Sequence, residues 1–239
     1  TFGGFLPNGT ELAPALREAV GGIVRVDNDA NMAVNAECLF GAARGLKHVV
    51  CMLDRGWVGC GLVLNGVLYR GKHNAAGELS AAQAGGEDDG GGRVPPPFLE
   101  SLWLEKAVKE SGYDLAKEKF DTRADMVEAL WSAAQDGEGE AMDLIEGQTE
   151  LLARASQRAA MLFDPEIVVL SGDWTVTGET GEEMIRKRLM ELWQSTDWTR
   201  RMELPKLAFS DLGQEAVSLG AAATDIDAVS AEATCKAAG

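Results

Sequence analysis

Apolar residues occur in two patterns along this chain, as short continuous runs and at helical spacing. Together the two patterns predict a sheet flanked by helices. Short apolar runs predict strands over 23–26, 48–53, 59–64, 67–69, 167–171 and 206–209. Apolar residues at helical spacing predict helices over 11–20, 29–43, 98–109, 122–134, 138–163, 180–193 and 214–229. The fold class is therefore α/β, with a helical block at about 98–163 inserted between strands.

Turn residues mark the ends of several of these elements. Asn65-Gly66 predicts a two-residue hairpin turn, because both residues tolerate positive φ angles. Asp164-Pro165 ends the longest predicted helix, since proline lacks the N–H that would continue it. The stretch 84–97, AGGEDDGGGRVPPP, cannot bury apolar surface and predicts a flexible loop.

Polar residues that could bind a small molecule lie around the first strands. Asn28 and Asp29 stand at the start of a predicted helix, and Glu78 directly follows Gly77. A carboxylate accepts hydrogen bonds from hydroxyl groups, and an amide can both donate and accept hydrogen bonds. From the residues alone, other interpretations stay open. Asp29 could cap the helix, Glu78 could be a solvated turn residue, and the glycine turn at 54–61 could be an ordinary hairpin.

Five segments in collinear order resemble the ROK family of sugar kinases and sugar-responsive repressors. They are Asn28-Asp29-Ala30-Asn31, the glycine turn before Leu62-Val63-Leu64-Asn65-Gly66, Ala76-Gly77-Glu78, residues 164–172, and Leu219-Gly220-Ala221-Ala222-Ala223. The resemblance implies an actin-like, ribonuclease-H-like ATPase fold of two lobes around a cleft. The family's first-lobe phosphate turn, Asp-x-Gly-Gly-Thr, has no match here. Residues 1–239 would then be the second lobe, which binds sugar and oligomerises, and the last helix, at about 214–229, would pack on the first lobe.

The resemblance also assigns roles to individual residues. The aspartate that matches Asp29 is the family's catalytic base, which accepts the proton of the attacking sugar hydroxyl. Asn28, Asp29 and Glu78 match substrate-binding positions. Where other members continue with Ile-Gly-His after the Gly-Glu pair, this chain has Leu79-Ser80-Ala81, so an imidazole contact to the sugar is missing.

The glycine turn lies where family kinases hold ATP phosphates through backbone donors. Gly56 and Gly59 are the candidate cofactor-binding residues by this resemblance, but Asp54, Arg55 and Trp57 depart from the kinase pattern. A carboxylate at such a turn would oppose the phosphate charge. We therefore expect ATP and magnesium only if the chain belongs to a kinase, and otherwise no cofactor.

A structural zinc is not expected. Family members that carry one hold it with cysteines after the Gly-Glu pair and with the nearby histidine, and tetrahedral zinc needs about four such ligands. Here no cysteine lies between Cys60 and Cys235, and the histidine is missing.

The charge and composition exclude other classes of protein. A net charge of −16, without a basic stripe, argues against nucleic-acid binding by this segment. No apolar run approaches the ~18 residues that span a bilayer. The sequence starts at Thr1 without the pattern of a signal peptide, and we interpret this start as a boundary within a longer protein. The four cysteines show no spacing typical of disulfide pairs, which suits the reducing cytoplasm.

The sequence thus suggests the sugar-sensing effector domain of a ROK-type transcriptional regulator, whose DNA-binding segment and first lobe lie outside this chain. The expected ligand is a hexose or N-acetylhexosamine, and the expected assembly is a homodimer. The alternative is the C-terminal lobe of an ATP-dependent hexose or amino-sugar kinase of the glucokinase type. A third hypothesis, a scaffold that has lost ligand binding, is opposed by the retained Asn28, Asp29 and Glu78.

Overall fold

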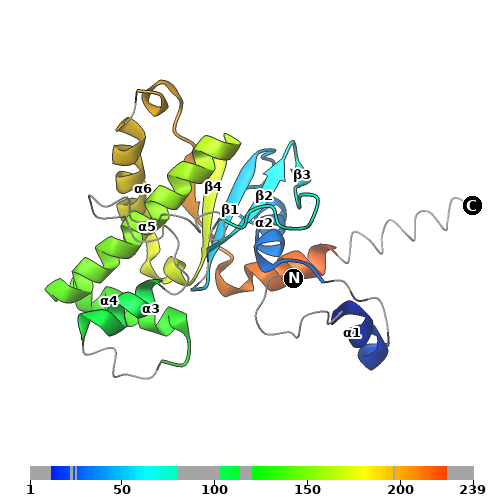
Figure 1. Cartoon of the computed structure of the whole chain (residues 1–239), viewed down its shortest axis with the longest axis horizontal. Coiled ribbons are helices and arrows are strands. Elements are labelled where there is room, and N and C mark those ends of the chain that lie inside the picture. The colour runs from blue at the N-terminus through cyan, green and yellow to red at the C-terminus, as the bar shows by residue number, and fades with distance from the viewer. Residues whose placement is uncertain are drawn as a thin grey trace, which may run out of the picture.

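A mixed five-stranded sheet forms the centre of the described structure (Figure 1). The computed structural model describes residues 12–21, 24, 26–56, 58–79, 103–113, 120–195 and 197–224. The strands run in the order β3-β2-β1-β4-β5. Their bounds are β1 (Val49–Asp54), β2 (Val58–Leu64), β3 (Val67–Leu68), β4 (Ile167–Gly172) and β5 (Lys206–Phe209).

The two central strands, β1 and β4, are parallel, and all their residues are buried. Burial on both faces explains why they read as continuous apolar runs rather than alternating ones. β2 and β3 add to β1 as an antiparallel hairpin, and β5 pairs parallel to β4. Asn65 and Gly66 have φ angles of 54° and 77°, which confirms the predicted hairpin turn.

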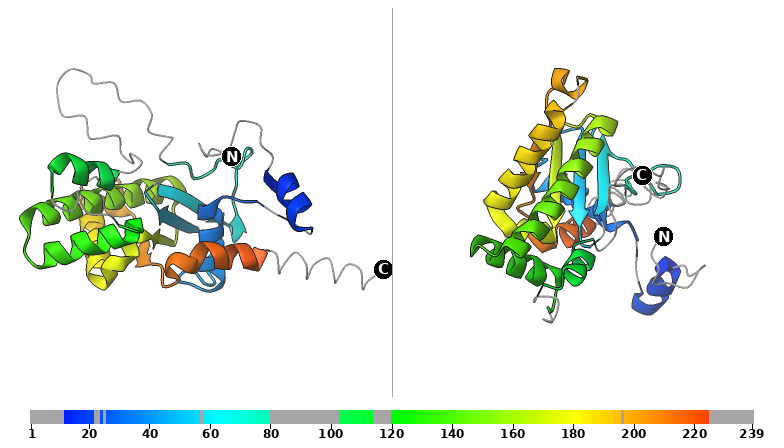
Figure 2. Two further views of the ribbon diagram at one scale, coloured as in Figure 1. Left: turned by 90° about the horizontal axis from the view of Figure 1, so that it is seen from below. Right: turned by 60° about the vertical axis from the view of Figure 1, so that its left-hand side comes forward.

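Helices cover both faces of the sheet (Figures 1 and 2). One face is covered by α5 (Gly139–Phe163) and α6 (Gly178–Gln194), and α3 (Trp103–Ser111) and α4 (Arg123–Gln135) pack against α5. The other face is covered by α2 (Asp29–Leu39) and, next to it, a helix described over 216–224. Helix α1 (Leu12–Val20) stands apart from the sheet on the α2 side (Figure 1). Between the described helices and strands lie the 3-10 turns η3 (Asp173–Thr177), η4 (Thr199–Arg201) and η5 (Gly213–Glu215).

The helical block between β3 and β4 is as predicted where it is described. Helix α4 begins with a capping box, in which Thr122 accepts from the Asp125 N–H and Asp125 accepts from the Thr122 N–H. Helix α5 ends at Phe163, and the next residue, Asp164, takes a left-handed conformation with φ of 45° before Pro165. The predicted loop at 84–97 lies outside the described residues.

Two predicted boundaries are wrong. The strand at 23–26 is not formed by its described residues, Val24 and Val26, because no neighbouring strand pairs with them there and the Val24 carbonyl instead accepts from Arg17 at 2.9 Å. Helix α2 ends at Leu39 rather than near 43, since the buried Glu37 carboxylate accepts from the Ala42 N–H at 3.0 Å and turns the chain.

The final helix packs on α2 through a glycine contact. A Cβ atom on Gly220 would lie 1.8 Å from the Met32 carbonyl oxygen, so only glycine permits this approach. Asn35 Nδ2 donates to the Gly220 carbonyl at 3.2 Å and to Thr224 Oγ1 at 3.0 Å. The described part of the final helix is therefore held by α2. No helix within the described ranges is both long and apolar enough to cross a membrane.

Helix α2 lies directly on β2, and this contact predicts a stability effect. A Cβ atom on Gly61 would lie 2.1 Å from the Ala30 carbonyl oxygen and 2.7 Å from Val34. Gly61→Ala should therefore lower the free energy of unfolding in urea by about 1–3 kcal/mol, because helix and strand must separate. Gly139→Ala, at a helix start with open space around it, should leave stability unchanged or slightly higher. Equal stability of Gly61→Ala and the parent would contradict the close packing.

Candidate functional site

Asn28, not Asp29, caps helix α2. Asn28 Oδ1 accepts from the N–H groups of Ala30 at 2.9 Å and Asn31 at 3.2 Å. Asp29 is the first residue of the helix, and its Oδ1 accepts from the Ala30 N–H at 2.8 Å. The interpretation of Asp29 as the helix cap is therefore wrong, since its neighbour performs that role. The side-chain oxygen of Asn28, Oδ1, accepts the capping hydrogen bonds. The Nδ2 group of Asn28 is then the group that could contact a sugar.

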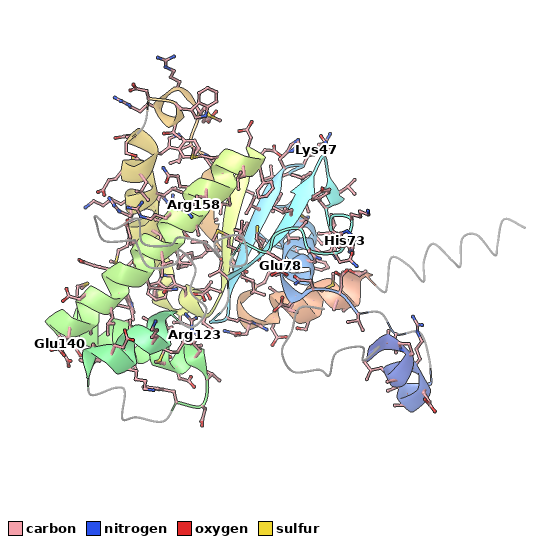
Figure 3. The ribbon with its side chains drawn as sticks, in the orientation of Figure 1. Lys47, His73, Glu78, Arg123, Glu140 and Arg158 are labelled. Atoms are coloured by element: carbon pink, nitrogen blue, oxygen red, sulfur yellow. The ribbon has the colours of Figure 1, made fainter. Side chains whose placement is uncertain are left out.

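Glu78 is brought to the sheet by the glycine before it. Gly77 has a φ of 88°, and a Cβ atom there would lie 1.8 Å from the Cys60 carbonyl oxygen on β2. Residue 77 must therefore be glycine for the loop after β3 to pass this close to the strand. Figure 3 shows Glu78 and His73 on this loop, on the β2–β3 side of the sheet.

The residues next to Asp29 and Glu78 contact the same strand, β2, from different segments of the chain. Ala30, next to Asp29, lies against Gly59 and Gly61, while Gly77, next to Glu78, lies against Cys60 between those two glycines. Three consecutive residues of β2 thus anchor the neighbours of both predicted carboxylates. The structure brings together the two segments that the sequence singled out, 49 residues apart along the chain by their numbers, 29 and 78.

A cavity of about 690 Å³ lies beside the start of α2. Its walls come from α1, the segment before α2, the first turns of α2, Arg70 and the final helix. The polar groups that line it are Arg17, Asp27, Asp29, Arg70 and Thr224. Asp29 therefore faces a space that could hold a hexose, whereas Asn28 and Glu78 do not line this cavity.

Asp27 is hydrogen-bonded through both carboxylate oxygens. Oδ1 accepts from the Asn28 N–H at 2.8 Å and from Asn31 Nδ2 at 3.1 Å, and Oδ2 accepts from Arg70 Nε at 2.9 Å and Nη2 at 2.6 Å. Partial burial opposes the charge, but these donors outweigh it and hold the pKa of Asp27 below its usual value. No motif in the sequence assigned a role to Asp27 or Arg70. The signal that could have indicated Asp27 is its position directly before Asn28-Asp29.

The glycine turn after β1 is closed from within by Asp54. Asp54 is 3% exposed, and its Oδ1 accepts from the Gly56 N–H at 3.3 Å. The Gly56 donor is thus engaged inside the protein. Gly59 lies on β2, where a Cβ atom would be 3.1 Å from the Ala30 Cβ, so packing accounts for this glycine. The argument that the Asp54 charge faces a bound phosphate is wrong, because the side chain points into the protein.

Arg123 neutralises the buried charge of Asp54. Its Nη1 lies 3.1 Å from Asp54 Oδ1 and 3.3 Å from Asp173 Oδ2, and its Nε lies 2.8 Å from Glu105 Oε1. Gln148 Nε2 also donates to Asp54 at 3.2 Å, from a position 94 residues away along the chain. Burial raises the pKa of Asp54 despite Arg123, and the three carboxylates raise the pKa of Arg123 despite its own burial.

No group of three or more metal-ligating side chains converges within the described ranges. Cys51 and Cys60 are buried in the core, and burial raises the pKa of the Cys60 thiol to about 12, so this thiol stays protonated. His73 is exposed on the loop before Glu78.

This chain matches a known protein family over most of its length. The family model described as ROK family matches residues 5–227. The bifunctional enzyme NanE/NanK of Brucella melitensis is 32% identical over 168 residues, which are 70% of this chain and 30% of that protein. This chain thus spans about a third of the length of that curated relative.

Two solved structures share the fold at higher coverage. The ROK hexokinase from Thermus thermophilus superposes with a TM-score of 0.65 at 26% identity, covering 87% of this chain and 67% of that one. A ROK family transcriptional regulator, described as a homologue of the Escherichia coli Mlc protein, gives a TM-score of 0.65 at 26% identity, covering 88% and 54%.

The α/β sheet of this chain is therefore that of the ROK sugar kinases, the actin-like ATPase fold. The chain belongs to the ROK family, as its motifs predicted.

The buried Arg123 cluster predicts a large stability effect. Arg123→Met leaves Asp54 and Asp173 buried without their cation and should lower the free energy of unfolding by about 3–5 kcal/mol. Arg154→Met is the matched control, because Arg154 is 41% exposed and pairs with Glu150 one helical turn away, so its loss should amount to less than about 1 kcal/mol. Urea denaturation measures both. A loss no greater than that of the control would show that Asp54 is not ionised in the folded protein.

Proposed function

We propose that this chain is the sugar-sensing lobe of a ROK-type transcriptional regulator that acts in the cytoplasm. The ligand is a hexose or an N-acetylhexosamine that Asp29 contacts in the cavity beside the start of α2, and that extends from there to Asn28 and Glu78, which do not line the cavity. Three features support it: Asp29 lines a cavity, it is relieved of the capping role by Asn28, and Glu78 is anchored to the same strand as the start of α2. The DNA-binding segment belongs to another part of the protein, since this one carries a net charge of −16.

The observation that favours a regulator over a kinase is the hydrogen bond from the Gly56 N–H to Asp54. Phosphoryl transfer needs backbone donors that are free to hold the phosphates. In this turn the Gly56 N–H donates to Asp54, which Arg123 and Gln148 hold in place. A phosphate would have to displace a buried and well-anchored carboxylate to use this donor.

The second candidate is a sugar kinase. It is favoured by the position of Asp29, which matches a catalytic base, and by the fold shared with the Thermus thermophilus hexokinase. In that case ATP and magnesium would bind between this lobe and the rest of the protein, and Asp29 would accept the proton of the attacking hydroxyl.

The two candidates are separated by measuring binding and turnover in full-length protein. Calorimetry with glucose, mannose, N-acetylglucosamine and N-acetylmannosamine should find a ligand, and Asp29→Asn should weaken its binding by tenfold or more, because an ionised acceptor is lost. A coupled ADP-release assay with ATP and magnesium should show no turnover of the bound sugar. Turnover that falls about 10²–10⁴-fold in Asp29→Asn would establish the kinase instead. Absence of binding to all four sugars would contradict both.

We also propose that the chain forms a homodimer through its helical block. Leu162, at the end of α5, is 68% exposed, and the preceding Met161 is 47% exposed. Leu162→Glu should weaken the dimer in sedimentation experiments at micromolar concentration, because a carboxylate would be buried at the contact. Val67→Glu, at an equally exposed apolar residue on β3, should leave the dimer intact. A monomeric parent protein would contradict the proposal.

A further inference from the structure

The Asp27–Arg70 ion pair joins the two segments that carry the proposed sugar-binding residues, Asp29 and Glu78. Asp27 immediately precedes the Asn28 cap and Asp29, and Arg70 begins the loop that leads to Glu78. Both oxygens of Asp27 are engaged, one by the Asn28 N–H and Asn31 and the other by the two-nitrogen fork of Arg70. A planar guanidinium held by two of its nitrogens is fixed in direction as well as in distance.

The loop between Arg70 and Glu78 is held at both ends, so fixing Arg70 also restricts the position of Glu78. The Ala76 N–H donates to the Arg70 carbonyl at 3.1 Å, which closes residues 70–76 into a compact turn. Gly77 then presses against the Cys60 carbonyl, so the far end of the loop is fixed on β2. Arg70 fixes the near end through Asp27. Glu78 therefore follows a loop that is held at both ends.

On the other side of the pair, Asp27 orients the buried Asn31. Asn31 is 2% exposed, and its Nδ2 donates to Asp27 at 3.1 Å. Among the described residues, Asn31 Oδ1 has no hydrogen-bond partner. Within the described part of the chain, the side-chain hydrogen bond that sets the direction of this amide is thus the one to Asp27. The same carboxylate touches the first turn of α2 and the loop after β3.

We infer that the Asp27–Arg70 pair is a positioning device that sets Glu78 relative to Asp29 for sugar binding. The inference rests on the proposed function, because it assumes that both carboxylates bind the sugar. The pair is partly exposed, with side-chain accessibilities of 36% for Arg70 and 20% for Asp27, and such pairs add little to global stability. Its effect falls on the arrangement of the two segments. A sugar that must order a loosened loop binds more weakly, since part of the binding free energy goes into ordering.

The test measures sugar affinity in five variants of the full-length protein, using the ligand found by calorimetry. Asp27→Asn, Arg70→Met and Arg70→Lys should each weaken binding by about tenfold or more. The lysine retains the charge and loses the fork, so its failure to restore binding separates geometry from charge. The double variant Asp27→Asn/Arg70→Met should bind no more weakly than the single ones, because both remove the same contact. Arg188→Met, at an arginine of the same 36% accessibility that pairs with Glu150 instead, should bind as the parent does.

Two results would overturn the inference. Losses that add in the double variant would mean that Asp27 and Arg70 act separately, for example by contacting the sugar directly. A fall in the midpoint of thermal unfolding of more than about 4 °C in the single variants would mean that the pair stabilises the whole fold rather than the site.

Hydrogen exchange without ligand makes the test independent of the proposed function. Asp27→Asn should speed exchange of the amides at 70–78 and of the first turn of α2, while β1 and β4 keep their protection. If the parent binds none of the sugars, the proposed function fails, and the exchange experiment still decides whether the pair holds the two segments. Unchanged exchange at 70–78 in Asp27→Asn would overturn the positioning role whatever the sugar results.

Discussion

The close approach of backbone to β2 is the constraint on which the candidate site depends. Helix α2 and the loop after β3 both come so near to this strand that a single Cβ atom on Gly61 or Gly77 would overlap a carbonyl oxygen. Each contact therefore requires glycine, and each places a carboxylate directly beside it. A site built in this way is set by the rigid sheet and not by the loops themselves, which is the arrangement that holds ligand groups most accurately.

A second buried arrangement, centred on Arg123, ties the helical block to the ends of β1 and β4. One guanidinium meets carboxylates from α3, β1 and η3, so four parts of the chain share one charge. Because Asp54 is held inside, the Gly56 N–H stays engaged within the turn after β1. The same residue that departs from the kinase motif is thus a structural part of this fold.

These two arrangements lie at different places and have different consequences. The cavity beside α2 is lined by the exposed carboxylate of Asp29 and by the paired Asp27 and Arg70. The turn after β1 instead holds its Gly56 N–H in a hydrogen bond to the buried Asp54. The proposal of a sensor rather than a catalyst rests on this contrast.

Elements that depend on neighbours along the chain could be predicted from the residues alone. Apolar spacing predicted the helical block and the central strands, Asn65-Gly66 the hairpin, Asp164-Pro165 the end of α5, and the order of the motifs the family. Features that depend on groups distant in sequence are set by the folded structure. No local pattern shows that Asp54 meets Arg123 and Gln148, that Arg70 meets Asp27, or that Asn28 rather than Asp29 caps α2. Pairing of charges and close backbone contacts are set by the folded arrangement, because each partner alone looks like an ordinary polar or glycine residue. For the same reason the apolar run at 23–26 predicted a strand that its described residues, Val24 and Val26, do not form, since a strand needs a partner for its hydrogen bonds.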